Sequence, residues 1–222
     1  MFDAVAYDFH WESVWEYRQK FIDGFFLTIV MAFFALILSL FIALFFTYGQ
    51  YSRLIFLRFL SRFYIETIRG TPLLVQILVF FYVFASALGV ENRYIAGVVI
   101  LALFSGAYVT EIIRSGIESI DIEQYDSAKS LGFTPFQTYR YIILPQAYKR
   151  IIPPLTGQFA SLIKDSSLLS IISIGELTMN AQEVNAYTYS TLESYIPLAV
   201  GYLMLTYPIS WYAKRLEQKM KD

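Results

Sequence analysis

Five stretches of the chain are almost free of charged residues. They cover residues 24–52, 70–90, 94–110, 151–175 and 194–213, and only the fourth contains charges, at Lys164 and Asp165. A helix needs about 20 mainly apolar residues to cross the roughly 30 Å core of a bilayer. A soluble helical bundle is disfavoured, because its helices would need polar faces that these stretches lack. The pattern predicts an all-α membrane protein, one transmembrane domain over residues 1–222 with about five transmembrane helices.

The first 23 residues differ from the apolar stretch that follows them. They are acidic and aromatic, and include Tyr7, Trp11, Trp15 and Tyr17. Such aromatic rings favour the boundary between lipid and water. A secretory signal peptide would begin with a basic region and have a shorter apolar run. Residues 1–23 are therefore predicted to lie at the membrane interface as a helix.

The basic residues predict which way the chain crosses the membrane. Alternate segments between the apolar stretches hold thirteen Lys and Arg residues, and the intervening segments hold three. Segments rich in Lys and Arg stay in the cytoplasm. The N-terminus is therefore predicted outside and the C-terminus in the cytoplasm, which requires an odd number of crossings.

Composition supports a membrane protein and excludes several chemistries. Hydrophobic residues make up 57% of the chain and charged residues 16%, against roughly 45–50% and about 25% in soluble domains. The net charge of −1 offers no reason to bind nucleic acid. There is no Cys, and His10 is the single histidine, so thiol chemistry, disulfides and a His-based metal site are not expected.

The longest polar stretch, residues 111–150, contains signals for two short helices. Asp121 and Gln124 have the spacing of a capping box, and Gly132 suits the end of a helix that starts at Ile122. This first helix is either a connector packed on the membrane surface or a docking helix for a partner protein.

The second helix of this stretch has its own start signals. Thr134 and Gln137 again have capping-box spacing, and Pro135 occupies the first helical position, where its missing N–H costs nothing. Pro145 is predicted to stop this helix. A disordered loop would not need such signals, so residues 111–150 are predicted to form a rigid structure.

Several motifs, taken in order, resemble one family. They are Gln124–Gly132, Ile143–Ala147 downstream of it, Arg69–Gln76, Ser105–Tyr108 with Glu111, and Lys164–Leu168. This set resembles the membrane-spanning permease subunits of ABC importers, in the polar amino-acid uptake subfamily that includes histidine, glutamine and arginine permeases. The resemblance covers about residues 24–217. The chain departs from the family pattern at Glu123, Asp126, Ser127 and Ser166.

The resemblance implies a fold, a function and a set of partners. The fold is the type I ABC importer transmembrane domain, and the chain is a permease subunit of an ATP-driven amino-acid importer in a prokaryotic inner membrane. Its partners are a second permease subunit, identical or related, cytoplasmic ATPase subunits that bind ATP and Mg, and an extracytoplasmic amino-acid-binding protein. No glycine is followed by Lys, so the chain lacks a P-loop and is not expected to be an enzyme or to bind a cofactor.

Residues 121–132 would then be the coupling helix, which transmits the closure of the ATPase to the membrane helices. The residues that the resemblance assigns to this contact are Gln124, Tyr125, Asp126, Ala128, Leu131 and Gly132. Ala128 is expected to keep the contact with the ATPase close, and Gly132 to allow a sharp exit from the helix.

Charged and polar residues within the fourth and second stretches are candidates for the substrate pathway. Lys164 and Asp165 together offer the two charges that a zwitterionic amino acid needs, and Gln158, Ser161 and Asp165 share one helix face. The full candidate set is Gln158, Ser161, Lys164, Asp165, Ser166 and Gln76.

Three of these candidates also have a structural alternative. Lys164 can pair with Glu111, Asp165 can pair with Arg114, and Gln76 can hydrogen-bond between helices. Thr71 and Pro72 are predicted to start the second apolar helix.

Two other functions remain open from the residues. A secondary transporter or channel for small polar solutes would need no ATPase, but such folds commonly show an internal repeat, and none is evident here. An intramembrane enzyme is disfavoured because no apolar stretch contains paired catalytic acids.

Overall fold

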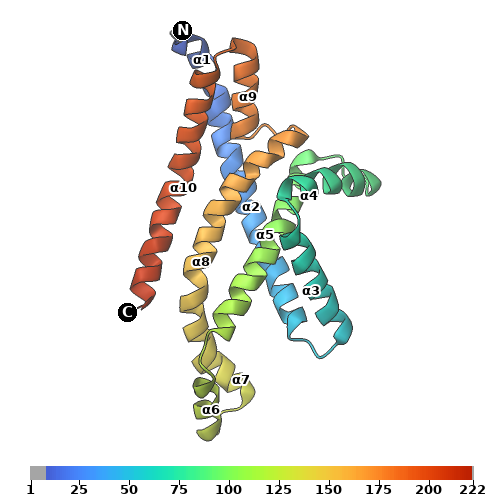
Figure 1. The fold of residues 1–222 in the computed structure, drawn as a ribbon, viewed down its shortest axis with the longest axis vertical. Coiled ribbons are helices and arrows are strands. Elements are labelled where there is room, and N and C mark those ends of the chain that lie inside the picture. Colours follow the sequence, from blue (N-terminus) through green and yellow to red (C-terminus); the bar gives the residue numbers. More distant parts are fainter. Residues whose placement is uncertain (1–8, 222) are drawn as a thin grey trace, which may run out of the picture.

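The computed structural model describes residues 9–221 of the chain. All regular elements in this part are helices, and the long ones form an elongated, splayed bundle (Figure 1). In chain order they are α1 (Trp11–Trp15), α2 (Arg18–Gln50), α3 (Ile55–Gly70), α4 (Leu73–Val79), the π-helix η1 (Phe80–Ala85), α5 (Arg93–Glu118), α6 (Ile122–Ser130), α7 (Pro135–Thr138), the π-helix η2 (Tyr139–Ile143), α8 (Leu144–Asp165), the 3-10 helix η3 (Ser166–Ile172), α9 (Leu177–Thr188) and α10 (Thr191–Lys221). This confirms the all-α prediction.

Two of the described helices, α2 and α5, are long and apolar enough to cross a membrane singly. The pair formed by α3 and the helix over Leu73–Ala85 meets the same criterion only jointly, as a span bent by 112°. The fourth apolar stretch lies mostly in α8 and η3, and the fifth lies in α10, which packs against α8 over part of its length (Figure 1). The total of five crossings stays a prediction.

The second apolar stretch, residues 70–90, is not one straight helix. Thr71 has an extended backbone (φ −124°, ψ 147°), because the residue before a proline is sterically disfavoured in the α region. Pro72 is the N-cap of α4, and the Thr71 hydroxyl donates to the Thr67 carbonyl at 2.8 Å instead of capping α4. The predicted start at Thr71 and Pro72 was therefore wrong by one position.

The bend also changes the role of residues 53–69, which the sequence suggested as a connection. Most of them form α3, which packs back along α2 (Figure 1). The 13 residues from Leu73 to Ala85 extend only about 20 Å at ~1.5 Å per residue. This is shorter than a bilayer core of about 30 Å, so α4 and η1 need α3 to complete a crossing.

The N-terminal segment contains only a short helix of its own. α1 covers five residues, and α2 already begins at Arg18, six positions before the predicted start of the first apolar stretch. Trp11 and Trp15 are exposed on α1. The predicted interfacial helix over residues 1–23 is therefore shorter than expected, and Tyr7 lies outside the described residues.

Small residues on one face of α2 allow the bundle to pack closely. The buried positions of α2 include Thr28, Ala32, Ala35, Ser39 and Ala43, whereas large side chains of the same helix, such as Phe33, Phe34, Phe41 and Phe45, are exposed. This distribution suits a lipid environment, in which close backbone approach rather than hydrophobic burial drives helix association. On the facing helix α5, a Cβ added to Gly106 would lie 2.8 Å from Ile42 Cγ2.

The fourth stretch, residues 151–175, also breaks before its predicted end. α8 stops at Asp165 and continues as η3, and Ser173 then adopts a left-handed conformation (φ 57°). The fully buried Glu176 caps α9 by accepting hydrogen bonds from the backbone N–H groups of Thr178 (2.9 Å) and Met179 (2.8 Å). The Tyr202 hydroxyl of α10 also donates to Glu176, at 2.7 Å. This carboxylate therefore joins the start of α9 to α10.

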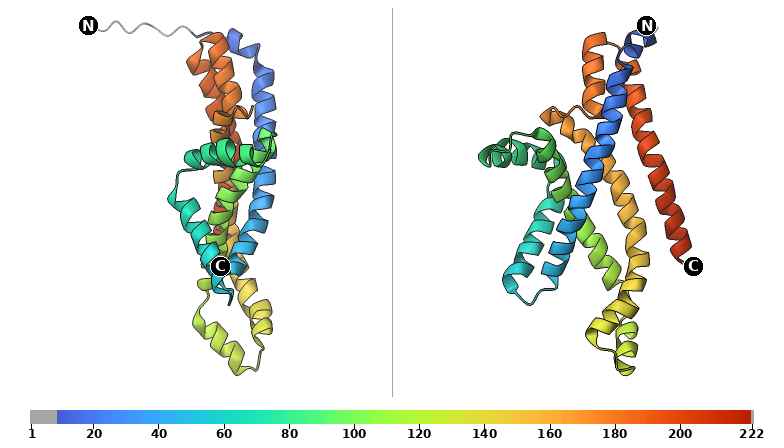
Figure 2. Two further views of the ribbon diagram at one scale, coloured as in Figure 1. Left: turned by 90° about the vertical axis from the view of Figure 1, so that its right-hand side faces the viewer. Right: turned by 180° about the vertical axis from the view of Figure 1, so that it is seen from behind.

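The helices α6 and α9 lie at opposite ends of the bundle (Figure 2), which provides a test of orientation. The chain has no native Cys, so single Lys129→Cys and Ala186→Cys variants each carry one thiol, at exposed positions. From the charge asymmetry, an impermeant maleimide should label residue 186 from outside intact cells and residue 129 only after permeabilisation. Labelling of residue 129 in intact cells would show that the topology is opposite to the predicted one.

Candidate functional site

The segment from α6 to η2 projects beyond the other helices at one end of the molecule (Figure 1). α6 covers Ile122–Ser130, where the sequence predicted a short helix. The predicted capping box at its start does not form, because the Asp121 side chain makes no cap hydrogen bond. The backbone N–H of Gln124 instead donates to the Asp121 carbonyl at 3.0 Å, which leaves the carboxylate of Asp121 exposed.

The end of α6 and the start of α7 follow the sequence signals closely. Gly132 has φ +79°, and its N–H donates to the Lys129 carbonyl at 3.0 Å, while the N–H of Phe133 donates to the Ala128 carbonyl at 3.1 Å. This is the Schellman arrangement, which a glycine at this position favours. The second predicted capping box is confirmed: Thr134 and Gln137 exchange hydrogen bonds of 2.8 and 3.3 Å.

Pro145 does not stop the second helix, contrary to the prediction. The chain passes from α7 through the π-helix η2 into α8, with Pro145 in the first turn of α8. The missing N–H and the ring of a proline disturb the carbonyl four residues earlier in an α-helix. Here that position lies in η2, where the wider π-turn accommodates the disturbance. The projecting segment is therefore continuous with α8.

A small apolar cluster attaches the projecting segment to α5 and α8. Ile120, Ile143 and Ala147 are buried, and Tyr125 packs on them. The Gln146 side chain donates to the Gln124 amide oxygen at 3.2 Å. These contacts join α6 directly to the start of α8.

Tyr125 also packs on its neighbour Tyr139. The two rings pack edge-on with centroids 5.9 Å apart. Partial burial raises the pKa of the Tyr125 hydroxyl, and the nearby Tyr139 raises it further. Tyr125 therefore remains neutral at physiological pH.

The structure divides the predicted coupling residues into inward and outward groups. Ala128 is fully buried within the chain, so its side chain faces inward, and the close contact with an ATPase that the sequence suggested stays a prediction. Leu131 is 75% exposed, and Ile122 and Phe136 are 70% and 74% exposed. Asp126 and Gly132 are also exposed. All five of these residues therefore lie on the surface of the projecting segment.

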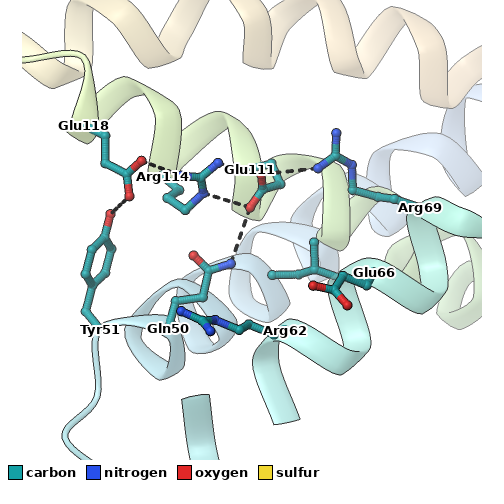
Figure 3. Close-up of a pocket in the computed structure, with 9 residues that line it drawn as sticks. Gln50, Tyr51, Arg62, Glu66, Arg69, Glu111, Arg114 and Glu118 are labelled. Carbon is teal, nitrogen blue, oxygen red and sulfur yellow. Dashed lines mark hydrogen bonds and ion pairs between the residues drawn. The ribbon is translucent and has the colours of Figure 1, made fainter. Parts of the chain in front are cut away.

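A second cluster combines many charges where α2, α3 and α5 meet. It surrounds a cavity of about 500 Å³ (Figure 3). The lining residues are Gln50, Tyr51, Arg62, Ile65, Glu66, Arg69, Glu111, Arg114 and Glu118.

Glu111 is the centre of this cluster. Its Oε2 lies 3.2 Å from Arg69 Nη1 on α3 and 2.9 Å from Arg114 Nη2 on α5. Arg114 Nε also donates to Glu111 Oε1 at 3.0 Å, which makes this pair bidentate. Arg114 pairs further with Glu118, which accepts a hydrogen bond of 3.0 Å from the Tyr51 hydroxyl (Figure 3). The network ties the bent α3 to α5.

These contacts overturn the two ion pairs considered from the sequence. Glu111 binds Arg69 and Arg114 rather than Lys164, and Asp165 does not pair with Arg114. Within the described part of the chain, Lys164 and Asp165 form no ion pair with another helix. The sequence missed the role of Arg69, although its position immediately before Gly70 and Pro72 marked the helix end from which it reaches α5.

The other pathway candidates occupy different environments. Gln158 lines a cavity of about 360 Å³ together with Arg69, Tyr108 and Glu111, and its amide lies 3.4 Å from Ser105 Oγ. The Arg69 guanidinium lies 5.5 Å from the ring centre of Tyr108. Gln158 therefore faces the charged interior between α3, α5 and α8.

Of the three remaining candidates, Gln76 and Ser166 form hydrogen bonds within the chain, and Ser161 is characterised by its burial alone. The buried Gln76 donates to the carbonyls of Ile68 (2.7 Å) and Thr71 (3.1 Å), which favours the interhelical alternative. Ser166 is buried and donates to the Ile163 carbonyl at 2.7 Å. Ser161 is half-buried.

The fold and these two clusters describe a class: a helical protein with apolar helices long enough to cross a membrane and a projecting helical segment at one end (Figure 1). Comparison with known proteins identifies the family. The chain belongs to the binding-protein-dependent transport system inner membrane component family, whose model matches residues 35–222.

Named relatives are similar over nearly the whole chain. The probable glutamine ABC transporter permease protein GlnP of Bacillus subtilis is 38% identical over 88% of this chain and 91% of its own length. The glutamine transport system permease protein GlnP of Escherichia coli K12 is 33% identical over 96% and 98%. A crystal structure of an amino acid ABC transporter with histidines is 36% identical, with a TM-score of 0.89 over 96% of this chain and 100% of that one.

The ion network predicts unequal effects of two similar substitutions. Glu111→Gln should lower the free energy of unfolding of the detergent-solubilised chain by about 1–3 kcal/mol, because Arg69 and Arg114 lose their shared carboxylate. The melting temperature should fall accordingly. The control is Glu66→Gln, which lines the same cavity and forms no ion pair in the described part of the chain; its effect should stay within about 0.5 kcal/mol. Equal melting temperatures for the two variants would contradict the network's structural role.

Proposed function

We propose that this chain is the permease subunit of an ATP-driven importer of polar amino acids, with glutamine as the first candidate substrate. The observation that carries this proposal is the likeness to an amino acid transporter over 96% of the chain at 36% identity. The named glutamine permeases support the choice of substrate. The chain would cross the prokaryotic inner membrane several times, with its N-terminus outside and its C-terminus in the cytoplasm.

The energy source in this proposal is a separate subunit. None of the eleven glycines is followed by Lys, so the phosphate-binding loop of an ATPase is not encoded. ATP and Mg would be bound by cytoplasmic ATPase subunits, and an extracytoplasmic binding protein would deliver the amino acid. Bacillus subtilis has two related proteins, GlnP and GlnM, both named as probable glutamine permeases, which supports a second permease subunit beside this one.

The projection built from α6 and α7 fits the role of a coupling element. ATPase closure must reach the membrane helices as a rigid movement. α6 ends in a Schellman motif, α7 starts with a capping box, and η2 joins the segment to α8 without a break. The exposed side chains of Ile122, Leu131 and Phe136 supply the apolar contact.

Lys164 and Asp165 fit a pathway between two permease subunits. Lys164 is exposed and Asp165 half-buried on the surface of an apolar helix. Facing lipid, each charge would cost roughly 2.5–3.5 kcal/mol. A wet pathway closed by a second subunit removes this cost, and the two charges match the carboxylate and ammonium groups of an amino acid.

The importer reading is tested by reconstituting the chain with its ATPase and binding protein in liposomes. ATP-dependent uptake of glutamine, with other amino acids as a panel, is the expected result. Glutamine flux through the isolated chain without the ATPase would instead favour a secondary transporter or channel.

Leu131 provides a test of the docking role. Leu131→Ser should weaken ATPase binding by about 2 kcal/mol, roughly thirtyfold, if its side chain is buried in the contact. Leu131→Met retains an apolar side chain of similar volume and should bind nearly normally. Affinity can be measured by titrating labelled ATPase against the permease in nanodiscs. Equal affinities for the two variants would contradict the docking role and favour the alternative, in which α6 is a connector packed on the membrane surface.

Asp165 tests the pathway. Because it has no ion-pair partner on another helix within the described residues, Asp165→Asn should assemble normally and keep basal ATPase activity. Loss of a charged contact to substrate should reduce uptake roughly tenfold or more, and Asp165→Glu should restore part of it. Failure of Asp165→Asn to assemble would show a structural bridge to the second subunit, and normal uptake would remove Asp165 from the pathway.

A further inference from the structure

A groove separate from the charged interior lies between α8 and α10. The two helices diverge towards the C-terminal end of α10 (Figures 1 and 2), and a cavity of about 850 Å³ opens there. It is lined by residues 149–157 of α8 and 210–220 of α10. None of its lining residues belongs to the cavities around Glu111 or Gln158.

Both helices contribute apolar residues to this groove. Pro153, Pro154, Ala213 and Met220 contribute to its lining. A Cβ added to Gly157 would meet no atom within 4 Å, so the glycine leaves free space instead of serving close helix packing. The groove therefore has room for an extended apolar group.

The rim of the groove is basic. It includes Lys149, Arg150 and Lys214 against one carboxylate, Glu217. Lys149 and Lys214 are exposed and form no ion pair with another residue of the described chain. The two lysines come from different helices, so both ammonium groups can approach one anion held between α8 and α10.

Neighbouring residues place the groove at the membrane boundary. Trp211 and Tyr212 are exposed on α10 beside the lining residues, and the Arg215 guanidinium lies 3.8 Å from the ring centre of Trp211. Further up the same helix, Leu203 and Met204 are exposed. Interfacial aromatic residues followed by an apolar surface mark the depth of lipid headgroups.

We propose that this groove binds the headgroup of an anionic phospholipid. The lysines would hold the phosphate, and the proline wall would contact the upper acyl chain. A free phosphate would leave the apolar wall unoccupied, whereas a phospholipid uses both parts. Basic pockets between transmembrane helices on the cytoplasmic side commonly hold such headgroups. The proposal requires membrane insertion but is independent of the solute that the chain transports.

Trp211 allows a direct measurement. The other two tryptophans, Trp11 and Trp15, lie on α1 at the far end of α10 (Figure 1). A full-length Trp11→Phe/Trp15→Phe variant therefore reports on the groove alone. In liposomes, brominated phosphatidylglycerol should quench Trp211 at lower mole fraction than brominated phosphatidylcholine. With each lysine contributing about fivefold to the binding of an anionic lipid, Lys149→Gln/Lys214→Gln should reduce the preference roughly 25-fold.

Matched variants separate the groove from general surface charge. Lys219→Gln removes an exposed cation that does not line the groove and should keep most of the preference. Gly157→Leu fills the groove without changing charge and should abolish it, while size-exclusion profiles verify that each variant remains folded. Excess inorganic phosphate should have no more effect than chloride at equal ionic strength.

Other results would overturn the proposal. Equal quenching by the two lipids, or equal effects of Lys219→Gln and the double lysine variant, would show only diffuse surface attraction. Relief of quenching by phosphate alone would show a simple anion site. Loss of the lipid preference when the ATPase or a second permease subunit is added would show that the groove is a protein interface. None of these results depends on transport activity, so they leave the importer proposal untouched.

Discussion

The backbone at helix breaks must be hydrogen-bonded by the protein itself, because lipid offers no alternative partner. This constraint explains the buried polar side chains of the bundle. At the bend between α3 and α4, Gln76 donates to the carbonyls of Ile68 and Thr71. At the break before α9, Glu176 accepts from two N–H groups, and Asn180 donates to the Gly175 carbonyl at 3.0 Å. At both of these breaks, a buried side chain hydrogen-bonds the freed backbone groups.

These breaks give the bundle its functional shape. Beside the bend at Pro72, Arg69 reaches across to α5, where it shares the carboxylate of Glu111 with Arg114. The charged cavity is thus a consequence of a steric rule about the residue before proline, and it provides a polar interior next to Gln158.

Rigidity has a similar origin in the projecting segment. Gly132 ends α6, Thr134 and Gln137 start α7, and η2 lets the chain pass Pro145 without unfolding. The apolar cluster around Ile143 then fixes the segment to α5 and α8. These local hydrogen bonds and apolar contacts hold the segment in place without any contribution from a partner.

The sequence by itself determined the helical class, the family, and the capping signals at Gly132 and Thr134, because these depend on residues close together in the chain. Tertiary structure decided what depends on distant partners. It buried Ala128, paired Glu111 with Arg69, and left Lys164 without a partner on another helix of the described chain. The bend between α3 and α4 and the early start of α2 could not be predicted from the sequence for the same reason. The composition of an apolar stretch indicates its preference for lipid. The residue at which a helix begins, the position of a bend and the direction of a charged side chain depend on the helices packed against it.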